Sequence, residues 1–566
     1  MPWTNRGQSD PTRMPNAART DSHGALAGNA APGGVSMHPP PATPATSLDS
    51  LLDTPLLALD GNLWTIRDAV EGTQVFGGNG SGKSSGSGRT IAEAFVRHGF
   101  GGLVLTAKPD DLQQWVGYLE SAGLGPADIA QRLLVVEPPD RPSPPVHTKD
   151  GQPLTLPTCR AFNFLTYEFD RCGHLTTDVV SLFINAMSPG SSSVSGTEPY
   201  WNDALQQLFT HAVDLATLAA EAETGTPTLR LRTVMDIISS APQSPLEAAS
   251  SGWRNTGRSA CWRCIDLVAE KLVRTGHLVG GRLSDFSRCL DYWTLEFPAL
   301  SDRTRSVIVS SLTSKAAGLL HSPMEELLCG EDDPLTSPAA PEETFRGRIV
   351  VLNLPVKLFG EVGRFGQTLW KTVWQRAVDR RTGKVMMAAG QRPVFLWCDE
   401  SQYFVTKEDV GFQQTARGSL AATVYLTQNL SNYYAAIGGA LSKAATDSLV
   451  GNLQTKIFHA LGDPATVEWA ERLYGKTVRA MSSRSQNLST RDDSIGRGAS
   501  STLIPVVEAH HFASLRTGGP VNNYQVDAWI YKAGKPWRQS ATTAEALGYP
   551  EVPPHILRCT FRQETQ

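Results

Sequence analysis

The stretch between Val75 and Thr90, VFGGNGSGKSSGSGRT, contains residue types at a spacing that could hold a nucleotide phosphate. It matches G-x-x-x-x-G-K-[ST] at every fixed position, ending in Lys83 and Ser84. Glycines let backbone N–H groups point at the phosphates, the lysine reaches the β- and γ-phosphates, and the serine hydroxyl ligates Mg²⁺. The predicted phosphate-binding residues are Gly77, Gly78, Asn79, Gly80, Ser81, Gly82, Lys83, Ser84 and Ser85.

A second candidate element is an apolar run that ends in two acids. Residues 394–398, VFLWC, have strand propensity and are followed by Asp399 and Glu400. At the carboxyl end of a buried parallel strand, Asp399 is expected to hold Mg²⁺ opposite Ser84. Glu400 is then placed to polarise the attacking water as a general base. Together with Lys83, these residues predict hydrolysis of a nucleoside triphosphate, with ATP and Mg²⁺ as cofactors.

The elements around these residues predict the fold class. TQVF, residues 73–76, is a plausible strand before the loop, and apolar residues at helical spacing follow it. Lys83 and Asp399 lie 316 positions apart, and most of the intervening segment reads as amphipathic helices. We therefore predict an α/β, RecA-like P-loop domain with a mostly parallel central sheet, interrupted by an inserted all-α domain.

The predicted domain boundaries follow from these patterns. Residues 1–50 are rich in Pro, Ala, Gly and Ser and are expected to be a disordered tail. The first part of the nucleotide-binding domain is expected over 51–167, and its second part over 341–545. The helical insert is expected over 168–340, and a C-terminal tail over 546–566.

Composition limits the function classes. The net charge of −4 argues against a basic coat for nucleic acid, although a motor that contacts nucleic acid only inside a channel stays possible. No run of about twenty apolar residues suggests a membrane-spanning helix. Cys261 and Cys264 are either neighbours on one helix face or half of a zinc site, and the first reading is favoured. The adjacent His510 and His511 are assigned no metal.

The order of the motifs resembles one family. Between about residues 55 and 540 the chain is similar to the type IV secretion coupling proteins, the TraG/TraD-like conjugative DNA-transfer ATPases of the FtsK/HerA group. The resemblance is carried by the collinear segments GGNGSGKSS, LVLTAKPDD, FNFL, PYWNDALQQLF, RTRSVIVSSL, IVVLNLP, FLWCDESQYF, ARGSLAATVYLTQNLSNYYAAIG and GNLQTKIFHALGDPATVEWAERLYGKTV.

The resemblance implies further roles. Gln428 corresponds to a polar residue that senses the γ-phosphate, and Arg417 stands where the family places an arginine finger, donated to a neighbouring subunit. The family further implies a homo-hexamer with single-stranded DNA in a central channel, and a relaxase or other cargo protein as partner. It also implies a membrane secretion machinery, reached through a separate protein. The expected location is the bacterial cytoplasm, or the inner membrane periphery through partners.

Two departures from the family and one polar segment leave alternatives open. Thr106 stands where family members commonly have an acid, and the chain does not begin with the usual transmembrane helices. The cargo could therefore be protein, or the chain could be a cytosolic DNA pump in defence. A nucleotide-binding assembly platform with little hydrolysis is the third reading. Residues 479–498, polar and arginine-containing, are either a mobile loop that faces DNA or a partner, or a solvated loop, and the solvated loop is favoured.

Overall fold

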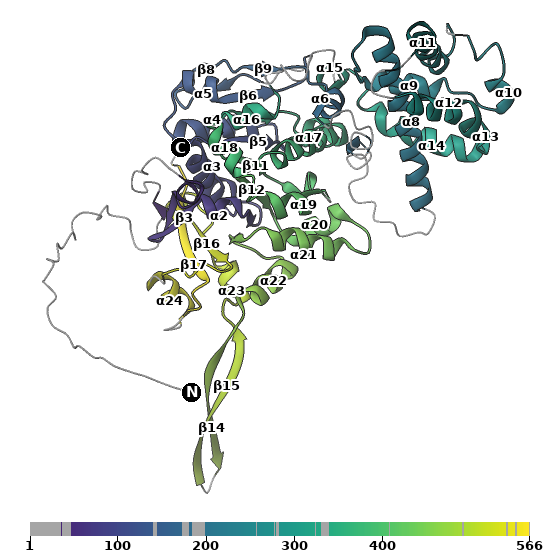
Figure 1. Cartoon of the computed structure of the whole chain (residues 1–566). Coiled ribbons are helices and arrows are strands. Elements are labelled where there is room, and N and C mark those ends of the chain that lie inside the picture. Colours follow the sequence, from purple (N-terminus) through teal and green to yellow (C-terminus); the bar gives the residue numbers. More distant parts are fainter. Residues whose placement is uncertain are drawn as a thin grey trace, which may run out of the picture.

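The structure is a computed structural model of the whole chain, shown in Figure 1. It describes residues 35–36, 47–139, 144–171, 180, 182–183, 198–255, 257–276, 278, 282–322, 324–329, 339–406, 408–489, 492–538, 541–548 and 552–564. Apart from residues 35–36 and 47–50, the predicted N-terminal tail lies outside this part of the chain.

A ten-stranded sheet forms the centre of the molecule, in the order β17-β16-β13-β4-β12-β11-β5-β10-β6-β9. Every neighbouring pair from β13 to β9 is parallel, whereas β16 and β17 are antiparallel to their neighbours. The strands are β4 (Thr73–Phe76), β5 (Gly101–Leu105), β6 (Leu133–Val136), β9 (Thr158–Cys159), β10 (Ile349–Leu352), β11 (Val394–Cys398), β12 (Ala421–Thr427), β13 (Thr455–Phe458), β16 (Gln525–Lys532) and β17 (Ile556–Arg562).

Helices cover both faces of this sheet, which explains why its central strands are apolar on both sides. On one face, Phe95 and Trp115 stack on Phe395 of β11, with ring centroids 5.3 and 5.4 Å apart. On the other face, Trp370 and Trp374 lie in a separate apolar core. The helices are α3 (Arg89–Arg97), α4 (Asp111–Ser121), α5 (Pro126–Arg132), α17 (Val356–Asp379), α18 (Gly383–Ala388), α19 (Glu408–Thr415), α20 (Leu430–Ile437), α21 (Ser442–Asn452), α22 (Pro464–Tyr474) and α23 (Ala509–Ala513).

A small layer precedes the sheet. Strands β1 (Val35–Ser36), β2 (Pro55–Leu59) and β3 (Asn62–Thr65) pair antiparallel. Two short helices, α1 (Leu48–Leu52) and α2 (Ile66–Val70), each begin with a capping box, which satisfies their first backbone N–H groups. Helix α2 ends just before β4, so this layer leads directly into the strand that carries the phosphate loop. A separate pair, β7 (Val146–His147) and β8 (Pro153–Leu154), follows β6.

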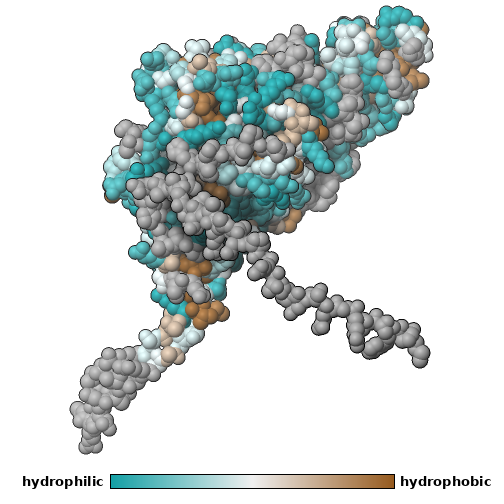
Figure 2. Space-filling model, turned by 60° about the vertical axis from the view of Figure 1, so that its left-hand side comes forward, coloured by the Kyte–Doolittle hydropathy of each residue, from teal (hydrophilic) through white to brown (hydrophobic). Residues whose placement is uncertain are grey.

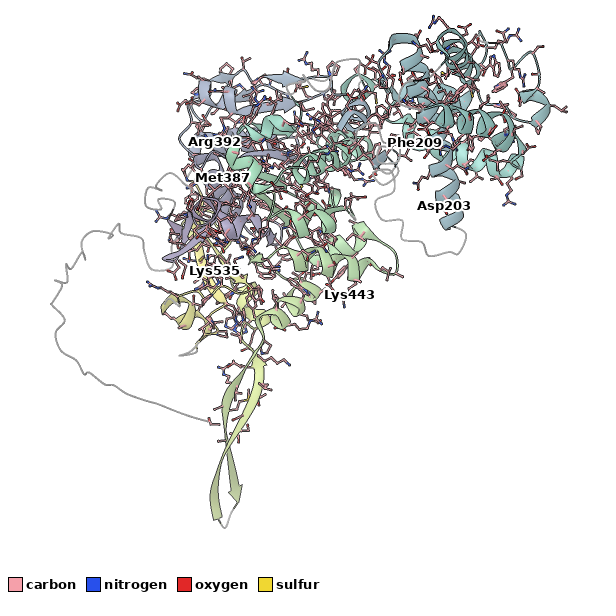
Figure 3. All side chains as sticks on the ribbon, in the orientation of Figure 1. Asp203, Phe209, Met387, Arg392, Lys443 and Lys535 are labelled. Atoms are coloured by element: carbon pink, nitrogen blue, oxygen red, sulfur yellow. The ribbon has the colours of Figure 1, made fainter. Side chains whose placement is uncertain are left out.

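A helical domain lies to one side of the sheet domain (Figure 1). Figure 3 labels Asp203 and Phe209 on its longest helix, α8, away from Met387, Arg392 and Lys535 of the sheet domain. Its helices are α8 (Glu198–Thr224), α9 (Leu231–Ser239), α10 (Pro245–Ala248), α11 (Ala260–Thr275), α12 (Leu283–Asp291), α13 (Phe297–Ala299) and α14 (Asp302–Ala317). Helices α6 (Phe164–Arg171), α15 (Met324–Cys329) and α16 (Glu342–Phe345) lie where the chain leaves and re-enters the sheet domain.

The segment expected to be a solvated loop differs in the structure. Strands β14 (Lys476–Ser489) and β15 (Asp492–Pro505) form a hairpin that projects from the sheet domain (Figure 1). Val478 and Leu503 lie directly opposite each other at the base of the hairpin. Each is 63% exposed, so the base presents apolar side chains to solvent. Figure 2 shows apolar residues gathered at this base. Cross-strand backbone pairing overrides the polar composition that suggested a loop.

The predicted C-terminal tail also differs. Helix α24 (Ala541–Leu547) and β17 occupy much of 541–562, and β17 completes the edge of the sheet beside β16. From Leu557 onward, β17 alternates buried apolar residues with more exposed polar ones. Leu557, Cys559 and Phe561 pack into the same core as α3. Among the described residues, none of the helices combines the length and apolarity needed to cross a bilayer.

Candidate functional site

The predicted phosphate loop follows β4 at the carboxyl end of the parallel strands. Gly77 N donates to Thr427 O at 3.2 Å and Gly78 N to Ala460 O at 2.9 Å, which ties the loop to both neighbouring strands. Gly82 has a φ of 83°, and a Cβ there would lie 2.7 Å from the Val526 side chain. A side chain is therefore excluded at this position by both conformation and space.

The serine of the loop meets the predicted metal-binding acid. Ser84 Oγ donates to Asp399 Oδ2 at 2.7 Å, although the two residues lie 315 positions apart. A hydroxyl and a carboxylate are hard oxygen donors of the kind that Mg²⁺ takes in nucleotide sites. The residues present thus fit the ion, and Ser84 and Asp399 are the two that would hold it.

Glu400 lies between two cations at the end of β11. Its Oε1 is 3.6 Å from Lys83 Nζ and 3.9 Å from Lys108 Nζ. Glu400 adopts the left-handed conformation, with φ 53° and ψ 49°, and its backbone N donates to Asp399 Oδ1 at 2.9 Å. Such a conformation costs a non-glycine residue about 1–2 kcal/mol, and strained residues of this kind cluster at active sites.

Two glutamines hold the other oxygen of Glu400. Gln402 Nε2 donates to Oε2 at 2.9 Å and Gln428 Nε2 at 3.5 Å. Burial raises the pKa of Glu400, but the hydrogen bond from Gln402 and the charges of Lys83 and Lys108 outweigh it and leave the pKa below its ordinary value. The carboxylate is therefore ionised at neutral pH and can accept a proton.

Gln428 and Glu400 share the lining of a cleft of about 630 Å³. The cleft lies between α17 and α20 and opens to solvent. Its lining residues are Lys108, Lys357, Glu361, Arg364, Glu400, Gln402, Tyr403, Val405, Gln428, Asn432, Ala435 and Ala436. Room thus exists beside Glu400 for a group that comes from outside the subunit.

Lys108, on the loop after β5, adds a second cation. Its Nζ lies 3.7 Å from Asp399 Oδ2. Burial lowers the pKa of Lys108, whereas the charges of Asp399, Asp111 and Glu400 outweigh that effect and raise it overall. Asp111 Oδ2 accepts hydrogen bonds from the backbone N of Ala107 and Lys108 at 2.7 and 2.8 Å, which fixes this loop.

Asp111 leads to a pH-dependent prediction. Burial raises its pKa from 3.8 to about 6, so ionised Asp111 disfavours the folded state. This cost is absent below the ordinary pKa and is complete above about pH 6. We expect Asp111→Asn, which keeps a carbonyl acceptor, to stabilise the protein by roughly 2 kcal/mol at pH 8 and by little at pH 4. Melting temperatures of both proteins across this range measure the effect, and a difference that grows as pH falls would contradict it.

A histidine that the sequence analysis did not identify supports the loop. His459 is fully buried; its Nε2 lies 2.7 Å from Ser87 Oγ and its Nδ1 3.0 Å from Asp527 O. Burial lowers its pKa to about 4, so the ring is neutral at physiological pH. With Nδ1–H donated to the carbonyl, Nε2 accepts the Ser87 hydroxyl and holds the start of the helix after the loop.

The end of the chain also contacts the phosphate loop. Gln563 Nε2 donates to Ser85 Oγ at 2.6 Å, and its Oε1 accepts from Gly519 N at 2.8 Å. Because β17 is parallel to β4, its carboxyl end reaches the same edge of the sheet. This contact spans 478 positions, and no motif in the sequence indicates it.

Arg417 does not lie beside the other predicted site residues. It occupies the turn between α19 and β12, at the amino end of a strand whose carboxyl end carries Gln428. At about 3.3 Å per residue, the seven residues of β12 place it on the order of 20 Å from its own phosphate loop. Its side chain is 54% exposed, and its Nη1 lies 3.6 Å from Glu71 Oε1.

The two cysteines of the helical domain are separate from this site. Cys261 and Cys264 share a face of α11, both are buried, and burial raises the pKa of each thiol. In the part of the chain that the structure describes, one group of three or more His, Cys, Asp or Glu residues has its donor atoms within 4.8 Å of one another. It consists of His211, Asp214 and Cys289 and does not include Cys261 or Cys264.

Comparisons with known proteins identify solved structures of similar fold. No protein-family model matches the sequence, and no curated protein resembles it significantly. The bacterial conjugative coupling protein TrwB in complex with sulphate is 12% identical, has a TM-score of 0.50, and the match covers 91% of this chain and 90% of TrwB. TrwB with ADP and Mg²⁺ is 13% identical, with a TM-score of 0.49 over 91% and 89%. VirB4 of Thermoanaerobacter pseudethanolicus is 12% identical, with a TM-score of 0.34 over 71% and 80%.

At this identity, the likeness concerns the fold. It confirms the predicted α/β, RecA-like P-loop architecture and the predicted structural resemblance to a conjugative coupling protein over most of the chain.

Proposed function

We propose that this chain is a P-loop ATPase that works as a ring motor and translocates DNA in conjugative or type IV secretion-type transfer. The observation that carries the proposal is the convergence of Lys83, Ser84, Asp399 and Glu400 at the carboxyl edge of the sheet. A surface loop with a chance lysine would not be joined to two acids more than three hundred positions away. The phosphate loop supports ATP as the proposed cofactor, and the paired Ser84 hydroxyl and Asp399 carboxylate support Mg²⁺.

Each residue of this cluster has a defined task in hydrolysis. The loop amides and Lys83 bind the phosphates, and Lys83 offsets charge that develops on the γ-phosphoryl group. Ser84 and Asp399 would hold Mg²⁺, which would neutralise phosphate charge when bound. Glu400 orients the water and accepts its proton, and Gln402 keeps that carboxylate in place. Gln428 is placed to exchange its hydrogen bond with Glu400 for one to the γ-phosphate.

The position of Arg417 favours a ring. An arginine on the order of 20 Å from its own phosphate loop cannot stabilise its own transition state. The open cleft beside Glu400 can receive an arginine from a neighbouring copy. An arginine finger donated in this way contributes about 10³–10⁵-fold to turnover. A closed homo-hexamer, in which each subunit completes the next site, fits both observations.

The proposed cargo is single-stranded DNA in the central channel, delivered with a relaxase or another cargo protein. The fold shared with the coupling protein TrwB supports this choice over a small-molecule kinase. Contacts with a phosphate backbone would be largely independent of sequence and sensitive to salt. A separate membrane protein of the secretion machinery would recruit the ring to the inner membrane of a bacterium.

Steady-state ATPase assays with and without single- and double-stranded DNA test this proposal. We expect DNA to stimulate hydrolysis and salt to weaken this stimulation. The Lys83→Ala and Arg417→Ala variants should lose the stimulated hydrolysis. An ATPase rate that changes with neither DNA nor salt would contradict the DNA motor and favour protein cargo. Nucleotide binding without hydrolysis under any condition would favour the assembly platform.

A further inference from the structure

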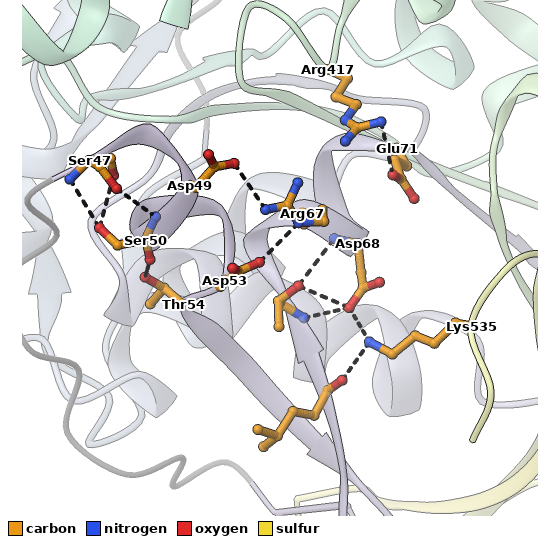
Figure 4. Close-up of polar contacts among 12 residues, drawn as sticks. Ser47, Asp49, Ser50, Asp53, Thr54, Arg67, Asp68, Glu71, Arg417 and Lys535 are labelled. Carbon is orange, nitrogen blue, oxygen red and sulfur yellow. Dashed lines mark hydrogen bonds and ion pairs between the residues drawn. The ribbon is translucent and has the colours of Figure 1, made fainter. Parts of the chain in front are cut away.

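The proposed finger has a partner in its own subunit. Figure 4 shows Arg417 paired with Glu71, near charged residues of the layer that β1 to β3, α1 and α2 form before the sheet. The ion pair joins Arg417 Nη1 to Glu71 Oε1 at 3.6 Å, and the other carboxylate oxygen, Oε2, lies 2.5 Å from Lys532 Nζ. Glu71 therefore bridges an exposed arginine and a buried lysine.

Glu71 is held on rigid backbone. It caps the C-terminal end of α2, and its carbonyl accepts from Gln454 N at 3.0 Å. The next residue, Gly72, has a φ of 82°, and a Cβ there would lie 2.5 Å from Gln413 Nε2. Strand β4 begins directly afterwards. The Glu71 carboxylate therefore projects from a fixed point beside the central strand.

The backbone that carries Arg417 is fixed as well. Ala421 N donates to Ala416 O at 3.0 Å, Gly383 N to Gly418 O at 3.0 Å, and Ser419 Oγ to Arg381 O at 3.0 Å. Since both ends of the turn are anchored, the remaining freedom belongs to the Arg417 side chain, which is more than half exposed. A long flexible side chain loses much rotamer entropy on binding unless a neighbour already orients it.

The contact with Glu71 leaves most of the Arg417 guanidinium free to bind another group. A guanidinium has five N–H donors, and Glu71 engages one end of it at a distance longer than a normal hydrogen bond. Exposed ion pairs of this kind are weak and exchange easily. Lys532 balances the Glu71 charge and holds the carboxylate from the other side, with Asp68 Oδ1 3.6 Å away from the same lysine.

We propose that Glu71 is a positioning residue that orients Arg417 toward the nucleotide site of the neighbouring subunit. This inference rests on the proposed function, since it needs a ring in which Arg417 acts in trans. Glu71 precedes β4, and the phosphate loop follows the other end of that strand. In this proposal Glu71 affects hydrolysis by orienting Arg417. It therefore acts in the subunit that donates the arginine finger, and not in the subunit whose phosphate loop binds the nucleotide.

Glu71→Gln tests the role in the assembled ring. We expect kcat to fall about fivefold with an unchanged KM for ATP, because an unguided arginine samples unproductive positions and an ion pair of this kind contributes up to about 1 kcal/mol. Glu71→Asp should recover part of the loss. Asp53→Asn is the matched control: Asp53 Oδ1 pairs with Arg67 Nε at 2.9 Å in the same cluster without touching Arg417. Wild-type turnover in Glu71→Gln, or an equal loss in Asp53→Asn, would overturn the proposal.

Mixed rings separate this inference from the proposed function. A 1:1 mixture of Lys83→Ala and Arg417→Ala subunits should regain about a quarter of wild-type activity, because one interface in four has an intact site and an intact finger. Failure of this reference mixture would contradict the trans finger itself. When it succeeds, Glu71→Gln mixed with Lys83→Ala should exceed both components alone. A mixture of Glu71→Gln and Arg417→Ala subunits should not exceed the activity of Glu71→Gln alone. The reverse pattern would place Glu71 on the phosphate-loop side and overturn its positioning role alone.

Discussion

Glu400→Gln is expected to lower kcat by about 10²–10⁴-fold while ATP still binds. The amide cannot accept a proton from water, yet it keeps the size of the carboxylate. Lys83, 3.6 Å away, loses an ionic neighbour but stays free to bind phosphate. The variant should therefore accumulate as a nucleotide-bound ring. Single-turnover hydrolysis and equilibrium nucleotide binding, measured on the same preparation, separate the two effects.

The control for this variant comes from the same cleft. Glu361 also lines it, but its side chain is 79% exposed and pairs with Arg364. Glu361→Gln should therefore leave turnover within about twofold of wild type. If Glu400→Gln hydrolyses ATP as fast as the wild type, the assignment of Glu400 as general base is wrong.

Lys371→Met is expected to lower the free energy of unfolding by about 3–5 kcal/mol. Lys371 and Asp409 are fully buried behind β11 and β12, and their charged atoms are 2.5 Å apart. Lys371 Nζ also donates to Phe404 O at 2.7 Å, which holds the segment after Glu400. Removing the lysine leaves an uncompensated carboxylate in the core. Urea denaturation monitored by tryptophan fluorescence measures the loss.

A double variant identifies the cause. In Lys371→Met/Asp409→Asn the buried charge is gone, and the amide oxygen still accepts from Gln375 and Tyr425, which donate to Asp409 Oδ1 at 2.7 and 2.9 Å. Much of the lost stability should return. The exposed Lys443, replaced by methionine, should change stability by less than about 0.5 kcal/mol. A double variant as unstable as the single one would show that packing, rather than charge, matters at this site.

The residues of the phosphate loop and the acidic strand could be predicted because their chemistry depends on local patterns. A glycine-rich loop between a strand and a helix, and two acids after an apolar run, each carry their signal within about fifteen residues. The parallel topology then brings the two ends together, and the structure places Ser84 and Asp399 in hydrogen-bond contact. Gln428, predicted only through the family resemblance, lies in the same cluster.

The contacts that the sequence did not predict are non-local. His459 meets Ser87 across 372 positions and Gln563 meets Ser85 across 478, and neither residue belongs to a recognisable spacing. The pairing of Glu71 with Arg417 depends on the order of strands in the sheet, which a local pattern does not give. The β14–β15 hairpin was missed because serine, glycine and arginine carry little strand signal.

The most direct test of the central claim is ATP-driven movement along DNA. The measurement is the release of streptavidin from the end of a biotinylated single-stranded oligonucleotide, with free biotin present to trap it. We predict release with wild-type protein and ATP, and none with Glu400→Gln or a non-hydrolysable ATP analogue. ATP hydrolysis that DNA stimulates strongly, without any release from either end of the strand, would contradict a translocating motor.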